Sequence, residues 1–136
     1  MKLQEAAAKH LLRGYGVSTP VGVVVTTPDE VRDTVGSIGP AMVKAQVPAG
    51  GRGKAGGVLS APDAASGQRA AEILLGSTLG NDVVSEVLVE EFVDIASELY
   101  LSVMIDTSAG CPVVMVSPRG GIHVEDTPEE FTRLHL

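Results

Sequence analysis

A stretch of twelve residues in the first half of the chain, Val47–Val58, limits most strongly what this sequence can fold into. Five of the twelve are glycine, none is acidic, and Arg52 and Lys54 stand between the glycines. Met42–Gln46 alternates as a strand does, and Val58-Leu59 can begin another strand. The sequence therefore predicts two strands joined by a glycine-rich basic loop, whose backbone N–H groups and cations favour an anionic ligand.

Several known phosphate-binding motifs can be compared with this loop. Gly51-x-Gly53-x-x-Gly56 matches the dinucleotide fingerprint, but that motif opens a helix, and Gly57–Ser60 is a poor helix start. The same residues match the glycine loop of protein kinases, except that Lys44 precedes the loop instead of following it. A Walker loop is excluded because it needs a glycine at the position of Pro48. A surface hairpin without a ligand stays open, although glycines this dense weaken a strand pair unless something requires them.

The composition predicts one cytoplasmic domain. A length of 136 residues suffices for one core, and 3% aromatic residues leave that core to Val, Leu, Ile, Ala and Met. The net charge of −7 argues against general nucleic-acid binding, which needs a basic face. The single cysteine, Cys111, excludes an internal disulfide framework and suits a reducing compartment. No apolar run has membrane-spanning length and the first residues do not resemble a signal peptide, so no membrane contact is expected.

Periodicity and capping residues predict alternating helices and strands. Thr27–Glu30 is the clearest helix start, with threonine at the N-cap, proline at the first helical position and glutamate three residues after the cap. Val23–Val25 is an unalternated β-branched run, typical of a strand covered on both faces. Thr127–Glu130 is a possible capping box for a helix near the end of the chain. The expected helices are 3–13, 28–38 and 64–75, and the expected strands are 21–25, 42–47, 58–59, 87–89, 99–105 and 113–116.

This order of elements predicts an α+β fold. The chain reads β-α-β-loop-β-α-β and then a β-hairpin, which differs from the regular alternation of a doubly wound sheet. A sheet that carries helices on one face would bury all the apolar patterns. Gly67 lies inside the third expected helix and weakens it by about 1 kcal/mol relative to alanine.

The charges are unevenly distributed along the chain. Lys44–Lys54 contains three cations and no acid, whereas Glu86–Glu98 contains five acids and no cation. If the two segments face each other, the cations can hold phosphates while the carboxylates accept hydrogen bonds from a sugar or a base amine. Taken singly, an exposed glutamate such as Glu90 or Glu98 is better explained as a solvated charge on a strand edge, so the prediction depends on the combination.

Two segments of the chain resemble the β subunit of ADP-forming succinate–CoA ligase (succinyl-CoA synthetase). They are Lys44–Val58 and Leu88–Tyr100, and Ala8-Lys9, Tyr15–Val17, Pro20–Gly22 and Ser117–Gly121 also fit the pattern of that subunit. The resemblance covers nearly the whole chain. It implies an incomplete ATP-grasp fold, with residues of about 20–93 in a small nucleotide-clamping lobe and residues 1–19 and 94–136 in part of a second lobe.

The same resemblance implies an ATP site without catalytic residues or metal ligands in this chain. Lys44 and the loop Gly51-Arg52-Gly53 would hold the phosphates. Glu90 and Val93 would lie beside the adenine, Val93 through its backbone, and Glu98 would lie near the ribose. Pro20 stands where members of the family that use ATP tend to carry proline, which weakly favours ATP over GTP as the nucleotide. The central hypothesis is that Lys44 and Glu98 face one cleft, in which the loop clamps the triphosphate.

In this family, succinate, CoA and ATP give succinyl-CoA, ADP and phosphate, a reaction of the tricarboxylic acid cycle. The reaction proceeds through a phosphohistidine on the partner α subunit, and none of His10, His123 and His135 matches that residue. Members of the family are longer, so the Mg²⁺ ligands and the domain that meets the α subunit are expected beyond Leu136. We therefore expect a partial β subunit that alone binds nucleotide weakly and catalyses nothing.

Three classes of function stay open from the sequence. The first is the ATP-binding portion of an acyl-CoA ligase, including related malate–CoA ligases and ATP-citrate lyase. The second is a stand-alone nucleotide-binding module without catalysis. The third, a glycine-loop protein that contacts RNA, is disfavoured by the acidic balance and the few aromatic residues.

Overall fold

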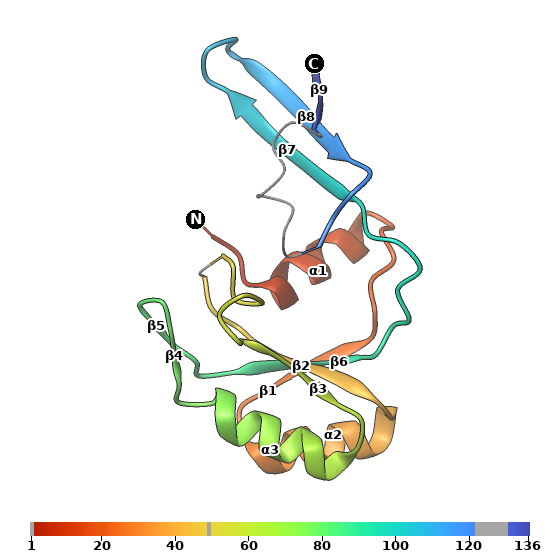
Figure 1. The fold of residues 1–136 in the computed structure, drawn as a ribbon, viewed down its shortest axis with the longest axis vertical. Helices are drawn as coiled ribbons and strands as arrows, with labels where there is room; N and C mark the ends of the chain where they lie inside the picture. Colours follow the sequence, from red (N-terminus) through yellow and green to blue (C-terminus); the bar gives the residue numbers. More distant parts are fainter. Residues whose placement is uncertain (1, 49, 122–130) are drawn as a thin grey trace. The chain divides into compact units, whose positions relative to one another are not determined.

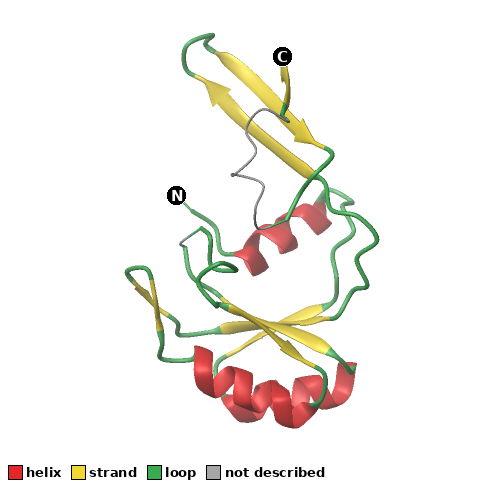
Figure 2. Cartoon of the chain, viewed as in Figure 1, coloured by secondary structure: helices red, strands yellow, loops and turns green. Residues whose placement is uncertain are grey.

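The computed structural model describes residues 2–48, 50–121 and 131–136. These residues form two compact units, residues 1–93 and residues 94–136. Figure 1 shows the elements of both units, and Figure 2 distinguishes the helices from the strands. In chain order they are α1 (Glu5–Gly14), β1 (Gly22–Val25), α2 (Pro28–Ile38), β2 (Ala41–Ala45), β3 (Val58–Ala61), α3 (Ala64–Leu74), β4 (Thr78–Leu79), β5 (Asp82–Val83), β6 (Val87–Glu91), β7 (Tyr100–Asp106), β8 (Cys111–Ser117) and β9 (Thr132–His135).

The first unit is built on a four-stranded antiparallel sheet with the order β1-β6-β2-β3. The predicted order is confirmed for α1, β1, α2, β2, β3, α3 and β6, although the short pair of β4 and β5 between α3 and β6 was not predicted. The hairpin that joins β2 and β3 through the glycine loop is also confirmed. The prediction that the helices share one face is wrong for α1. Helices α2 and α3 cover one face of the sheet, whereas α1 lies across the other (Figure 2).

The hydrophobic core lies between the sheet and the α2–α3 layer. Because side chains of a strand alternate between its faces, Ala41, Val43 and Ala45 of β2 point into this core while Met42 and Lys44 point to the opposite face. The core consists of valine, alanine and leucine, as the scarcity of aromatic residues predicts. Its buried members are Val25, Val31, Val35, Ala41, Val43, Ala45, Val47, Ala61, Ala70, Ala71, Leu74, Leu79, Val84, Val87 and Val89.

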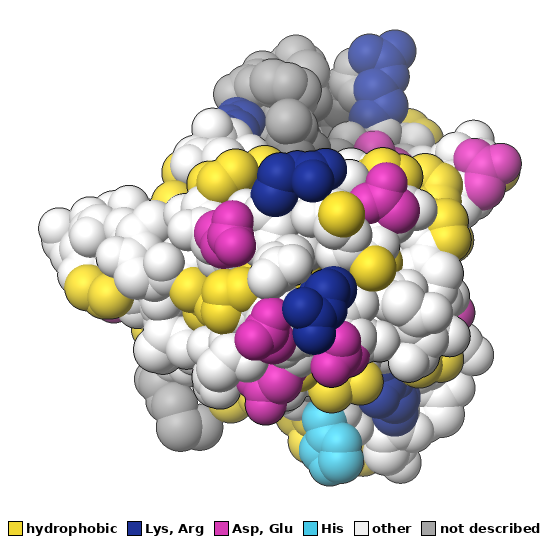
Figure 3. All heavy atoms as spheres, turned by 90° about the horizontal axis from the view of Figure 1, so that it is seen from below, with side chains coloured by type: hydrophobic (Ala, Val, Ile, Leu, Met, Phe, Trp, Pro, Cys, Tyr) yellow, Lys and Arg dark blue, Asp and Glu magenta, His cyan; other side chains and the backbone are white. Residues whose placement is uncertain are grey.

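Helix α2 begins where its capping box predicts. The Thr27 side chain accepts a hydrogen bond from the backbone of Glu30, and the Glu30 carboxylate accepts from the backbone of Thr27 at 3.0 Å. Val31 and Val35 of this helix are buried against α3 and the sheet. The outer surface on the side of α2 and α3 carries acidic and basic side chains next to one another (Figure 3), including the ion pairs of Arg32 with Asp29 and Asp33.

Gly67 in α3 has a packing role that periodicity does not reveal. A Cβ atom at this position would lie 2.8 Å from Cγ2 of Val35 and 3.4 Å from Cγ1 of Val31. The missing side chain therefore allows α3 to approach α2 closely. Glycine lowers the stability of a helix, but here the close approach buries Val31 and Val35, and this burial offsets that loss.

We expect Gly67→Ala to destabilise the first unit by about 1–3 kcal/mol, because the added methyl group overpacks the α2–α3 contact. Gly36→Ala is the matched control. A Cβ there would meet only the Cβ of Ala64, at 4.0 Å, so the higher helix propensity of alanine should stabilise the protein by up to about 1 kcal/mol. Urea unfolding measures both changes. Stabilisation of similar size by both variants would contradict the packing role of Gly67.

Two further predictions about strands and helices are wrong. β1 is not covered on both faces: among the described residues it is an edge strand that pairs only with β6, and Val23 and Val24 are exposed. A β-branched run is equally compatible with an edge position, so composition could not distinguish the two. The end of the chain is not helical, because residues Thr132–His135 form β9 and pair with β8. The possible capping box at Thr127–Glu130 falls outside the described residues.

The second unit is a three-stranded antiparallel sheet with the order β7-β8-β9. The predicted hairpin of β7 and β8 is confirmed, and its polar turn is held by the Asp106 carboxylate, which accepts from the backbone of Ser108 and Ala109. Nε2 of His135 in β9 lies 2.9 Å from Oδ2 of Asp106. This hydrogen bond is the main reason why the pKa of Asp106 is below its ordinary value.

Candidate functional site

Backbone hydrogen bonds within the glycine loop between β2 and β3 satisfy some of the loop's own N–H groups. The N–H groups of Ala55, Gly56 and Gly57 donate to carbonyls of Gly51, Gly53 and Arg52, at 3.1, 3.3 and 2.7 Å. Gly51 and Gly56 have positive φ angles of 71° and 78°, which favour glycine. At Gly57 a Cβ would lie 2.7 Å from Cδ1 of Leu79. The glycines thus make a compact turn as well as a surface that a ligand can approach.

Lys44 and Glu90 lie side by side on the face of the sheet that points away from the α2–α3 core. They come from neighbouring strands, because Met42 pairs with Glu90 and Lys44 pairs with Leu88 in the β2–β6 ladder. The ammonium group of Lys44 donates to Oε2 of Glu90. Glu90 is 3% exposed and Lys44 17%, so this ion pair is largely removed from water.

Helix α1 adds a second carboxylate and a second lysine to this pair. Lys9 donates to the other oxygen of Glu90, and Oε1 of Glu5 lies 2.8 Å from Nζ of Lys9 and 3.2 Å from Nζ of Lys44. The spacing of four residues places Glu5 and Lys9 on one face of the helix. The buried side chain of Gln46 also holds α1, since its Oε1 accepts from the backbone N–H of Ala6 at 3.0 Å.

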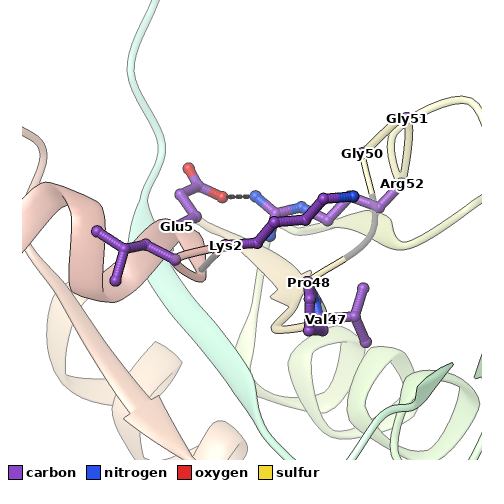
Figure 4. Close-up of a pocket in the computed structure, with 8 residues that line it drawn as sticks. Lys2, Glu5, Val47, Pro48, Gly50, Gly51 and Arg52 are labelled. Carbon is purple, nitrogen blue, oxygen red and sulfur yellow. Dashed lines mark hydrogen bonds and ion pairs between the residues drawn. The ribbon is translucent and has the colours of Figure 1, made fainter.

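Arg52 joins the network from the glycine loop. Its guanidinium pairs with Oε2 of Glu5 and donates to the carbonyl of Ala45 at 3.0 Å. In Figure 4 the side chains of Glu5 and Arg52 point toward each other, one from α1 and the other from the loop. They border an open pocket of about 530 Å³ that is also lined by Lys2, Leu3, Val47, Pro48, Gly50 and Gly51.

We name these five charged side chains, Glu5, Lys9, Lys44, Arg52 and Glu90, the loop–helix network. It contains three cations and two carboxylates, so its formal charge is +1 in a chain whose net charge is −7. A positive cluster beside glycine backbone and an open pocket is suited to an anion with several oxygens.

Burial and ion pairing oppose each other in this network. Burial by itself raises the pKa of Glu90, but the hydrogen bonds and charges of Lys44 and Lys9 outweigh it and hold the pKa of Glu90 below its ordinary value of 4.5. Burial is also the main cause that lowers the pKa of Lys9, and the charge of Lys44 adds to it. Burial likewise lowers the pKa of Arg52. Glu90 is thus the ionised centre that holds two lysines.

The structure brings together some of the residues that the sequence singled out. Lys44, Arg52 and Glu90 meet in the loop–helix network, Gly51 lines the adjacent pocket, and Gly53 belongs to the same loop. Both oxygens of Glu90 accept from lysines, so here it anchors cations.

Val93 and Glu98 are not part of the network. Val93 is an exposed residue two positions after the end of β6. Glu98 belongs to the second unit, where its backbone carbonyl accepts from the N–H of Gly120 at 2.9 Å. The predicted cleft between Lys44 and Glu98 stays a prediction. So does the grouping of residues 1–19 with residues 94–136, although here α1 belongs to the first unit and contacts its sheet through the network.

Sequence reasoning missed Glu5, Lys9 and Gln46 as members of this site. The available signal was the pair Glu5–Lys9 at a spacing of four, which fits any solvated helix equally well. Only the packing of α1 across the sheet shows that the pair faces Lys44 and Glu90.

Two other classes of site can be examined in the part of the chain that the structure describes. Within residues 2–48, 50–121 and 131–136, no three His, Cys, Asp or Glu side chains gather in a way that could hold a metal ion. Over the same residues, no helix combines the length and apolarity that crossing a bilayer requires.

Comparison with known proteins gives one family for nearly the whole chain. The ATP-grasp domain family matches residues 2–135. The subunit beta of succinate–CoA ligase [ADP-forming] from Halobacterium salinarum is 45% identical, and the match covers 100% of this chain and 37% of that protein. The subunits of the same name from Gemmatimonas aurantiaca and Methanothermobacter thermautotrophicus are 45% and 39% identical, and the matches cover 96% and 100% of this chain and 36% and 38% of those proteins. This chain therefore spans little more than a third of the length of these curated relatives.

Solved structures show the same fold at lower sequence identity. The dinucleotide-forming acetyl-coenzyme A synthetase 1 of Ca. Korarchaeum cryptofilum, in complex with coenzyme A, Ca-AMPCP and HgCl+, superposes with a TM-score of 0.80 at 22% identity, over 98% of this chain and 59% of that one. ATP citrate lyase from Methanothrix soehngenii gives a TM-score of 0.71 at 19% identity, over 99% of this chain and 34% of that one.

Proposed function

This chain belongs to the ATP-grasp domain family, and from that membership we propose that it is the ATP-binding portion of the β subunit of an ADP-forming succinate–CoA ligase. The ATP-grasp fold and the resemblance to these β subunits, both expected from the sequence, are confirmed. In the complete enzyme the proposed reaction converts succinate, CoA and ATP to succinyl-CoA, ADP and phosphate. The higher identity to succinate–CoA ligase subunits than to the acetyl-coenzyme A synthetase or the citrate lyase favours this member of the family.

One observation carries the proposal: Lys44 of β2 and Arg52 of the glycine loop converge on the same carboxylate beside an open pocket. Two cations that can reach both oxygens of one carboxylate can also hold two oxygens of a phosphate. Lys44 supplies a point charge and Arg52 a planar fork of donors. The backbone of Gly51 and Gly53 leaves room for phosphates to approach the loop.

The remaining contacts to ATP are proposed from the family pattern. Val93 would contact the adenine through its backbone, and Glu98 the ribose. Glu90 was expected beside the adenine, and its two lysine partners support an additional role in positioning Lys44. Mg²⁺ would neutralise charge on the phosphates during transfer. From the family pattern, we propose that the Mg²⁺ ligands come from the rest of a complete β subunit.

The complete enzyme is proposed to need an α subunit that carries the phosphohistidine and to use succinate and CoA as its other substrates. Phosphoryl transfer depends on placing the acceptor, the metal and the phosphates together. Residues 1–136 supply the proposed cations for the phosphates. We therefore propose that this chain by itself binds ATP without transferring its phosphate.

The proposal is tested by calorimetric titration of the purified chain with ATP and by its thermal unfolding. We expect ATP to bind and to raise the unfolding temperature, since a ligand at about 100 times its Kd adds about 2.7 kcal/mol of stability. Adenosine, which lacks phosphates, is the control and should protect far less. GTP should protect less than ATP. Equal protection by adenosine and ATP, or none by either, would contradict a phosphate site at the glycine loop.

A further inference from the structure

We propose that Glu5 of α1 is a resident anion that occupies the phosphate-binding cations in the nucleotide-free protein and must release them when a phosphate binds. This inference rests on the proposed function. It adds a residue outside the two motifs that point to ATP, and it makes α1 a determinant of nucleotide affinity.

The first argument is geometric. Oε2 of Glu5 pairs with Arg52 while Oε1 lies 3.2 Å from Nζ of Lys44, so one carboxylate spans two cations from two different elements. These are the same two cations that the proposed function assigns to phosphate. A carboxylate and a phosphate present similar oxygens to Arg and Lys, so the two anions compete for the same N–H groups of Lys44 and Arg52.

The second argument separates Glu5 from Glu90, the other carboxylate of the loop–helix network. Glu90 is 3% exposed, and each of its oxygens accepts from a lysine. Glu5 is 21% exposed and lines the pocket beside Pro48 and Gly51. A ligand that enters the pocket therefore meets Glu5 first, and Glu90 stays to hold Lys9 and Lys44 in place.

The third argument concerns the cost of moving Glu5. Helix α1 has no buried residue, and the side chain of its N-cap residue, Gln4, makes no capping hydrogen bond. Leu3 and Leu11 are exposed, so a shift of the first turn would break the hydrogen bond between Ala6 and Gln46 but would uncover no core. Lys9, 2.8 Å from Oε1, keeps one partner for the displaced carboxylate within the same helix. Exchange of anions thus leaves no buried charge unpaired.

The test is Glu5→Gln, which keeps the size of the side chain and removes its charge. Inorganic tripolyphosphate and ATP are titrated calorimetrically into wild type and variant at low ionic strength, where charge effects are least screened. We expect both ligands to bind Glu5→Gln about fivefold to tenfold more tightly, at the lower end of typical couplings between sites. Glu72→Gln, an exposed position on α3, makes the same change in net charge and should leave both affinities unchanged.

The outcomes separate this inference from the proposed function. If wild type binds ATP and Glu5→Gln binds it equally or more weakly, Glu5 is not a competitor, although the ATP site stands. If only Glu5→Gln binds, the inference holds and the function proposed for the wild-type chain fails. If neither binds tripolyphosphate or ATP, both ideas fail.

A second variant covers the case in which Glu5→Gln does not fold. Glu5→Asp keeps the charge but shortens the side chain by one methylene group, which draws the carboxylate away from Arg52 and Lys44. Tighter tripolyphosphate binding by Glu5→Asp than by wild type supports the inference. Unchanged or weaker binding overturns it.

Discussion

Lys44→Ala is expected to reduce strongly the protection of this chain by ATP against thermal unfolding. Lys44 is the only one of the proposed phosphate ligands that belongs to a central strand of the sheet, and its ammonium group already holds the carboxylates of Glu5 and Glu90. A hydrogen bond to a charged group contributes roughly 1.5–3 kcal/mol, so its loss should weaken ATP binding by about 10-fold to 100-fold.

Calorimetric titration and the shift of unfolding temperature with ATP measure this loss. Arg69→Ala is the matched control, because it removes one exposed cation from α3, on the other side of the sheet, and should leave ATP binding unchanged. Lys44→Arg retains the positive charge in a different geometry and should bind with an intermediate affinity. If Lys44→Ala binds ATP as wild type does, the assignment of Lys44 to the phosphates is wrong.

Glu90→Ala should give the largest loss of folding stability, about 3 kcal/mol. The substitution leaves the ammonium groups of Lys9 and Lys44 without their most buried partner, at side-chain exposures of only 19% and 17%. Removal of one member of a buried ion pair costs about 3–5 kcal/mol, and the partial exposure of the lysines places this case at the lower end. Urea unfolding measures the change, and Glu72→Ala on the exposed face of α3 should stay within about 0.5 kcal/mol of wild type.

The same carboxylate predicts how stability changes in acid. Because the pKa of Glu90 is lower in the folded protein than its ordinary value of 4.5, its contribution is fully present above pH 4.5 and is lost as the pH falls through the lower folded pKa. Glu90→Gln lacks this titration, so its difference in stability from wild type should shrink in that range. A constant difference from neutral pH down to acid would show that the charge of Glu90 contributes nothing.

Local patterns in the sequence predicted much of the first unit. The capping box located α2, and alternation with turn chemistry located β2, β3 and their glycine loop. These features depend on residues close together in the chain, so periodicity reveals them. The motif around Lys44 and Arg52 indicated the family, which the ATP-grasp match confirms, and it predicted phosphate binding at the loop.

Other features depended on contacts between distant residues. The sequence predicted that Gly67 weakens its helix, whereas in the structure this glycine allows close packing against Val35. The valines of β1 were predicted to be buried on both faces, but they lie on an edge strand. The last residues were predicted to be helical, but they pair with β8. In each case the deciding partner is far away in the sequence, and no local window contains it.

Local patterns are enough to predict which residues alternate, where α2 is capped and which loop presents cations. The position of α1 across the polar face of the sheet, where Glu5 and Lys9 meet Lys44, Arg52 and Glu90, is visible only in the folded chain. Charges attract without regard to their spacing along the chain, so a pair that fits any solvated helix becomes part of a site only when folding places opposite charges beside it.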